Sequence, residues 1–171
     1  MVDFRPFQGI RYQTSVAGPL DGLVCPPYDV ITPAQERQLL ERSRYNMVRL
    51  ELAELTGPPS PDRYTAAADC YRQWLAEGVL RRDDAPCYYL LRQRFPHGPG
   101  ALERYSVTGA LRLEEWGTGV LPHEHTGATA KADRMSLMEE CDANFSPLMG
   151  LFRDHDGLLS RLREWAAARP P

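Results

Sequence analysis

The stretch RYSVTGALRLE, from Arg104 to Glu114, decides the fold class that the sequence predicts. Apolar or small side chains at the odd positions from 105 to 113 alternate with mostly polar ones at the even positions, which is the period of a half-buried β-strand. A second strand-like run covers residues 87–95, and the proline- and glycine-rich segment 96–100 separates the two. The sequence therefore predicts an antiparallel β-hairpin at the centre of the fold.

Helical patterns lie on both sides of this hairpin. Thr32, Pro33 and Gln35 occupy the N-cap, first and third positions of a capping box, which predicts a helix from there to about Arg44. Apolar residues recur at helical spacing from Pro61 to Glu77, and further helices are predicted over about 133–141, with Met135 and Met138 inward, and 157–168. Additional strands are predicted over 3–12, 23–25, 47–52 and 146–152.

This mixture predicts an α+β (mixed α/β) fold. We expect a mixed sheet with a central antiparallel hairpin, packed by several amphipathic helices. At 171 residues the chain fits a single domain, residues 1–171. The glycine-rich signatures of dinucleotide-binding folds and of P-loop proteins do not occur in the sequence.

Composition and charge narrow the classes of function. Hydrophobic residues make up 43% and charged residues 25% of the chain, which are ordinary globular values. A net charge of −3 argues against duplex DNA as a partner. The first residues carry neither a basic nor an apolar signal region, and no apolar run reaches the length of a membrane span, so we expect a cytoplasmic protein without a membrane partner.

The candidate functional centre is the stretch from His123 to Arg134, which reads HEHTGATAKADR. It combines proton carriers, hydroxyl groups, a flexible glycine and charged side chains within twelve positions. It also contains Lys131, the only lysine among the 20 basic residues. If the beginning of the stretch is extended, His123 and His125 point to one side and Glu124 to the other.

Two kinds of chemistry compete for this stretch. In one, His123 and His125 bind a divalent metal ion, and a carboxylate elsewhere completes the ligand set of a metal-dependent hydrolase. In the other, Glu124 is the general base and His123 a second catalytic residue, while Thr126, Lys131 and Arg134 bind phosphate oxygens. A purely structural alternative is that Asp133 caps a helix and Arg134 pairs with Glu139 or Glu140.

Several ordered motifs carry a resemblance to a known family. They are Arg5-Pro6-Phe7, Pro26-Pro27-Tyr28-Asp29-Val30-Ile31, the helix of Trp74 ending in Gly78-Val79-Leu80, His123-Glu124-x-Thr126, Asp133-Arg134, and Asn144-x-Ser146-Pro147. In this order and spacing they resemble the uncharacterised bacterial and archaeal family called domain of unknown function 1015. Members of that family are much longer than this chain and carry an Asp-Gly-His-His-Arg motif in their later half. The resemblance thus implies that the chain is the N-terminal part of a longer architecture.

The family is in turn similar to ParB-type nucleotide-binding domains and to free-serine kinases, through the Gly-His-His-Arg turn and the lead-in matched here by Leu121-Pro122-His123-Glu124. This similarity implies a nucleotide-dependent phosphotransferase acting on a small hydroxyl substrate, with ATP, ADP or CTP and Mg²⁺ as cofactors and Glu124 near the substrate hydroxyl. The alternative is a noncatalytic module that binds a nucleotide or a partner. Because the phosphate-binding turn does not occur in this sequence, we also expect an oligomer or pairing with a missing C-terminal half.

Overall fold

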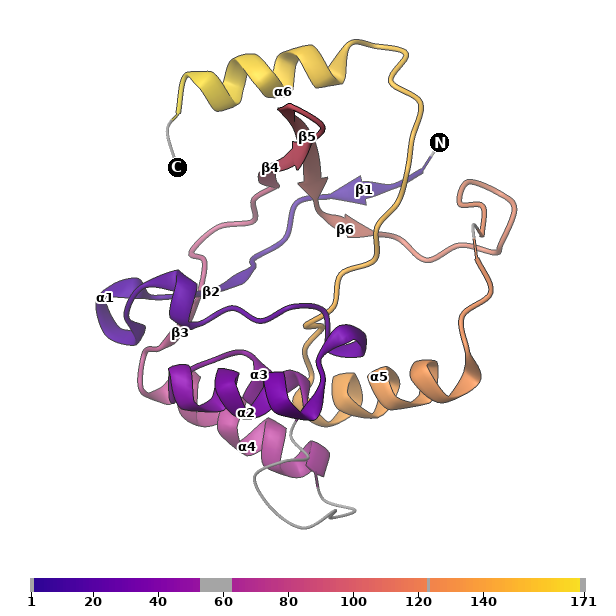
Figure 1. The fold of residues 1–171 in the computed structure, drawn as a ribbon. Helices are drawn as coiled ribbons and strands as arrows, with labels where there is room; N and C mark the ends of the chain where they lie inside the picture. The colour runs from indigo at the N-terminus through magenta and orange to yellow at the C-terminus, as the bar shows by residue number, and fades with distance from the viewer. Residues whose placement is uncertain (1, 53–62, 123, 170–171) are drawn as a thin grey trace. The chain divides into compact units, whose positions relative to one another are not determined.

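The computed structural model describes residues 2–52, 63–122 and 124–169, which form two compact units. Unit 1 comprises Met1–Gly9, Asp83–His123 and Leu148–Pro171, and unit 2 comprises Ile10–Arg82 and Glu124–Pro147. Helices and strands both contribute, so the predicted α+β class is confirmed (Figure 1). The prediction of a single domain stays a prediction.

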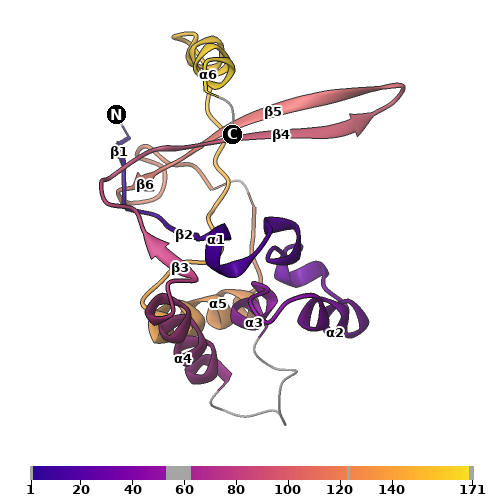
Figure 2. The same cartoon turned by 90° about the vertical axis from the view of Figure 1, so that its left-hand side faces the viewer.

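Unit 1 is built on the predicted hairpin. β4 (Tyr89–His97) and β5 (Gly100–Thr108) pair antiparallel along their whole length, and Figure 2 shows them as one long ribbon. Gly98, at a φ of 54°, and Pro99 make the turn, which is tighter than the predicted loop because strand pairing continues to His97 and Gly100. β1 (Phe4–Arg5) pairs with β6 (Ala110–Leu111), and α6 (Leu158–Ala167) packs against both strands of the hairpin.

The strands do not join into one mixed sheet, and this part of the prediction is wrong for the described residues. They form three two-stranded antiparallel sheets: β1 with β6, β4 with β5, and β2 (Ile10–Tyr12) with β3 (Leu80–Arg82). Alternation along a strand predicts that one face is buried, but it does not say which strands become neighbours.

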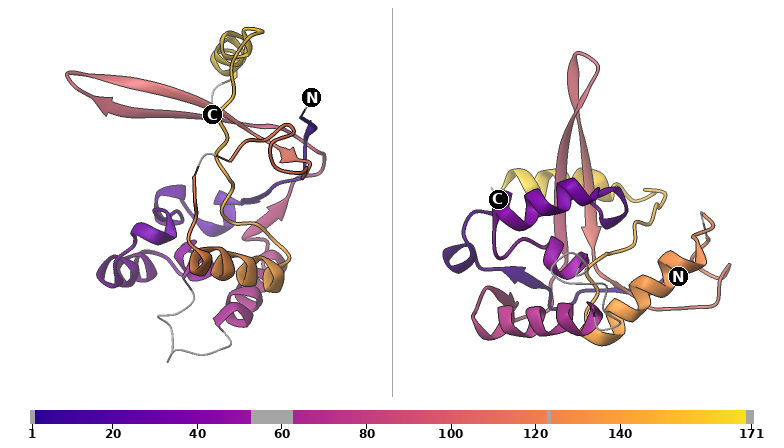
Figure 3. Two further views of the ribbon diagram at one scale, coloured as in Figure 1. Left: turned by 90° about the vertical axis from the view of Figure 1, so that its right-hand side faces the viewer. Right: turned by 60° about the horizontal axis from the view of Figure 1, so that its bottom comes forward.

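Unit 2 is mainly helical. Its helices include α2 (Pro33–Arg42), α3 (Val48–Glu51), α4 (Arg63–Ala76) and α5 (Ala128–Cys141), of which α3, α4 and α5 contribute residues to the hydrophobic core. α4 and α5 pack against each other, as the right-hand view of Figure 3 shows. Unit 2 also contains the short helix α1 (Thr14–Ala17), the 3₁₀ turns η1 (Leu20–Gly22) and η2 (Tyr28–Val30), and the sheet of β2 and β3.

The core of unit 2 lies under the aromatic face of α4. Trp74 is almost completely buried, and the Tyr45 ring packs edge-on against it. The predicted capping box is confirmed, because the Thr32 side chain accepts a hydrogen bond from the backbone N–H of Gln35 and the Gln35 side chain accepts one from the backbone N–H of Thr32. Leu137 and Cys141 are the buried residues of α5, so the prediction that Met135 and Met138 point inward is wrong.

The segment 47–52 was predicted to be a strand, but it contains helix α3. The buried Asn46 side chain explains the difference. Its amide nitrogen donates to the carbonyl oxygens of Gly22 and Val24, at 2.8 and 3.2 Å, and its oxygen accepts a hydrogen bond from the N–H of Val48 at 3.1 Å. These contacts stabilise a helical turn where the local pattern of apolar residues favours a strand. The strand predicted at 23–25 is likewise absent, because this described segment runs without strand pairing.

The prediction that residues 146–152 form a buried strand is also wrong. The segment has no regular secondary structure, and Leu148 and Leu151 are 96% and 91% exposed. An apolar run is buried only where another element supplies a matching surface, and no described strand pairs with this one. Among the helices of the described ranges, none has the length and apolar character that crossing a membrane requires.

Candidate functional site

Helix α5 begins at Ala128, immediately after the stretch of interest and earlier than the predicted start at Asp133. Residues 128–132 include three alanines, the strongest helix formers, which explains the early start. The N-cap is Gly127, which makes no side-chain capping hydrogen bond, and the first turn of the helix contains no acidic residue. Because glycine has no side chain, the N-cap residue itself provides no side-chain acceptor for the first N–H groups of α5.

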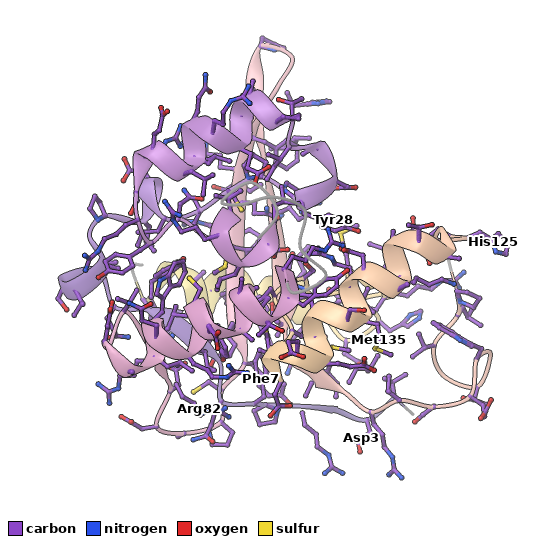
Figure 4. All side chains as sticks on the ribbon, turned by 90° about the horizontal axis from the view of Figure 1, so that it is seen from below. Asp3, Phe7, Tyr28, Arg82, His125 and Met135 are labelled. Carbon is purple, nitrogen blue, oxygen red and sulfur yellow. The ribbon has the colours of Figure 1, made fainter. Side chains whose placement is uncertain are left out.

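Four of the residues singled out in the sequence, Glu124, His125, Thr126 and Lys131, lie around this helix start within unit 2. Glu124, His125 and Thr126 precede α5 and are exposed, and Figure 4 shows His125 projecting from the end of the helix. Lys131 lies in the first turn of α5 with an exposed side chain, and its N–H donates to the carbonyl oxygen of Gly127 at 3.2 Å. His123 lies outside the described residues.

Arg134, the remaining predicted phosphate-binding residue, lies on the inner face of α5. One terminal nitrogen donates to Glu51 Oε2 at 2.6 Å, and the other donates to the backbone carbonyl of Glu51 at 3.1 Å. Its guanidinium group also lies over the ring of Tyr28, 3.9 Å from the ring centroid. Arg134 therefore joins α5 to α3 and η2, instead of pairing with Glu139 or Glu140.

Asp133 does not cap α5, because it lies inside the helix. Its Oδ2 accepts hydrogen bonds from Arg134 Nε at 2.8 Å and from a terminal nitrogen at 2.5 Å. Its Oδ1 accepts from the Tyr64 hydroxyl at 2.9 Å and from the Arg63 guanidinium. Asp133 thus connects α5 to the beginning of α4.

These contacts form a polar cluster, which we define as Glu51, Arg63, Tyr64, Asp133 and Arg134. The side chains of Glu51, Asp133 and Arg134 are 9%, 19% and 21% exposed, so the charges interact in a weakly solvated environment. Together with three leucine side chains, the cluster lines a pocket of about 190 Å³ within unit 2.

The two carboxyl groups of the polar cluster shift in opposite directions. Burial raises the pKa of Glu51, and the attraction and hydrogen bond of Arg134 offset only part of this effect. Burial acts in the same direction on Asp133, but the hydrogen bonds from Arg134 and Tyr64, with the charges of Arg134 and Arg63, bring its pKa below the ordinary value. The cluster thus contains one carboxylate that is strongly held in its charged form and one that is not.

Sequence reasoning missed Glu51, Arg63 and Tyr64. No pattern in the chain marks them, since Glu51 contacts Arg134 across 83 positions. One signal could have located their neighbourhood. The family-like motifs contributed Tyr28, which stacks on Arg134, and Ser146, whose hydroxyl lies 3.4 Å from both carboxylate oxygens of Glu51. Motifs that are far apart in the sequence therefore meet at the polar cluster.

A metal centre was the competing prediction for His123 and His125. Within the part of the chain that the structure describes, no three His, Cys, Asp or Glu side chains are grouped so that they could hold a metal ion. This finding does not include His123, which lies outside the described residues.

Comparison with known proteins gives one match. No curated protein and no solved structure matches the chain. A family model matches residues 4–171, nearly the whole sequence, and it agrees with the resemblance carried by the ordered motifs. The chain belongs to the family described as Protein of unknown function (DUF1015).

Proposed function

We propose that this chain binds the phosphate groups of a nucleotide at the start of α5, as part of a nucleotide-dependent phosphotransferase. The observation that carries the proposal is the start of α5 at a glycine N-cap, with no acidic residue in its first turn, directly behind the stretch that begins at Glu124. The first N–H groups of a helix and the positive end of its dipole favour a bound anion at such a position. Lys131 adds a positive charge in the same turn, and the hydroxyl groups of Thr126 and Thr129 add donors.

The similarity of the lead-in Leu121–Glu124 to ParB-type domains and free-serine kinases supports a nucleotide, either ATP, ADP or CTP with Mg²⁺, as the ligand. Glu124 is the proposed general base, with His123 beside it in the sequence. We leave Arg134 out of the phosphate site, because Glu51 and Asp133 already accept hydrogen bonds from its guanidinium group.

A noncatalytic nucleotide-binding module is the second candidate. It is favoured by the exposure of Glu124, His125 and Thr126, since phosphoryl transfer usually needs a site from which water is excluded. The variant Glu124→Gln separates the two candidates. If the variant loses phosphate transfer but still binds nucleotide, the enzyme is supported. If the wild-type protein binds nucleotide but transfers no phosphate, the noncatalytic module is supported.

Isothermal titration calorimetry with ATP, ADP and CTP, each with and without Mg²⁺, tests the shared part of both candidates. We expect one nucleotide to bind and Lys131→Gln to weaken its binding at least tenfold, because the phosphate oxygens lose a cation. Arg161→Gln is the matched control, since it removes a charge from an exposed position on α6 in unit 1. Absence of binding by all three nucleotides contradicts the proposal, as does equal weakening by the two variants.

A further inference from the structure

We infer that the pocket lined by the polar cluster binds a small neutral polyhydroxyl compound, with the Glu51 carboxylate accepting a hydrogen bond from one of its hydroxyl groups. The pocket lies within unit 2 and is formed by residues of α3, α4 and α5. The role of this pocket as the acceptor site of a phosphotransferase rests on the proposed function. Binding of the polyhydroxyl compound in the pocket does not require a nucleotide.

The coordination of Glu51 leaves room for another donor. Its Oε2 accepts the 2.6 Å hydrogen bond from Arg134, while its Oε1 receives, from the described residues, only the 3.4 Å contact of the Ser146 hydroxyl. A contact of that length is at the weak end of hydrogen bonding. Because the side chain is only 9% exposed, a ligand hydroxyl that donates to Oε1 from the pocket gives this carboxylate a stronger partner than the Ser146 contact.

The charges of the pocket argue for a neutral ligand. Arg134 pairs with Glu51 and Asp133, and Arg63 pairs with Asp133, so two carboxylates face two guanidinium groups. An anionic ligand would have to compete with carboxylates that already hold these cations. A neutral hydroxyl compound needs no change in this pairing.

Size and lining complete the description of the ligand. A volume of about 190 Å³ suits a small molecule, because pockets for drug-sized ligands measure about 300–1,000 Å³. Leu50, Leu52 and Leu137 supply an apolar wall, against which the C–H groups of a polyol pack. Glycerol has the size and functional groups that this combination selects.

Ligand-observed saturation-transfer NMR on the whole chain, without nucleotide, tests the inference. Glycerol is the probe, and glycerol 3-phosphate is the anionic counterpart of the same carbon skeleton. We expect glycerol to bind and the phosphate ester to bind at least tenfold more weakly. Glu51→Gln should weaken glycerol binding at least tenfold, while Glu164→Gln, an exposed position on α6, should leave it unchanged.

A second variant keeps the test decisive if Glu51→Gln does not fold. Leu52→Phe enlarges a partly exposed side chain of the pocket lining and should abolish glycerol binding by filling the pocket, whereas Leu159→Phe on α6 should not. The inference is overturned if wild-type protein does not bind glycerol, if it prefers the phosphate ester, or if Leu52→Phe binds glycerol like wild type. Glycerol binding without nucleotide binding overturns only the proposed function.

Discussion

Replacing Arg134 by methionine should destabilise unit 2 strongly. The side chain donates four hydrogen bonds, two to Asp133 and one each to the carboxylate and the backbone carbonyl of Glu51, and it stacks on Tyr28. Methionine keeps the apolar stem and removes the charge. The variant leaves the carboxylate of Glu51, which is 9% exposed, without its cation.

The expected loss of unfolding free energy is about 3 kcal/mol. Breaking a buried ion pair by removing one partner costs about 3–5 kcal/mol, and the 21% exposure of Arg134 favours the lower end of that range. Arg72→Met is the matched control, because its side chain and that of its partner Asp69 are 58% and 69% exposed. Such a surface pair contributes about 0–1 kcal/mol. The double variant Glu51→Gln with Arg134→Met should recover at least about 1 kcal/mol relative to the sum of the single changes.

The assay is urea unfolding followed by tryptophan fluorescence. Trp74 is 3% exposed in the core of unit 2, whereas Trp116 and Trp165 belong to unit 1 and are 70% and 49% exposed. Replacing both exposed residues by phenylalanine gives a background in which the signal reports unit 2 alone. The reasoning is refuted if Arg134→Met costs no more than Arg72→Met, or if the double variant is simply additive. In either case the polar cluster would not stabilise the unit as a coupled network.

Two further predictions concern one unit each. The pKa of Asp133 is lowered in the folded state, so the ionised side chain stabilises the fold above its ordinary pKa, and this stabilisation is lost as the pH falls through the folded pKa. Asp133→Asn should therefore reduce the loss of unfolding free energy, measured with urea, between about pH 5 and 2. Asp69→Asn, at an exposed site, should leave this pH dependence unchanged. In unit 1, a Cβ atom at Gly109 would lie 2.5 Å from the Phe4 ring and 2.9 Å from the Arg5 carbonyl oxygen, so Gly109→Ala should separate β1 from β6 at a cost of about 1–3 kcal/mol. Faster hydrogen exchange at the N–H of Arg112, which donates to the carbonyl of Asp3, would report that separation, and wild-type exchange there would contradict it.

Local sequence determined the elements whose stabilising contacts lie within a few positions. The capping box at Thr32, the helical spacing that becomes α4, and the alternation that becomes β5 all depend on neighbours along the chain, and the structure has each of them. The start of α5 at Ala128 belongs to the same class, because the alanines that favour it are visible in the sequence. The family could also be identified from the order of the motifs, and the match over residues 4–171 confirms it.

Tertiary structure alone decided the rest, because it depends on contacts between distant positions. Residues 47–52 become helical through the hydrogen bonds of Asn46 to Gly22 and Val24, and the apolar run 146–152 stays exposed because no described strand pairs with it. The polar cluster depends on the meeting of Glu51 and Arg134, whose separation of 83 positions leaves no local periodicity to detect. Burial then raises the pKa of Glu51, an effect that exists only after the surrounding elements have excluded water.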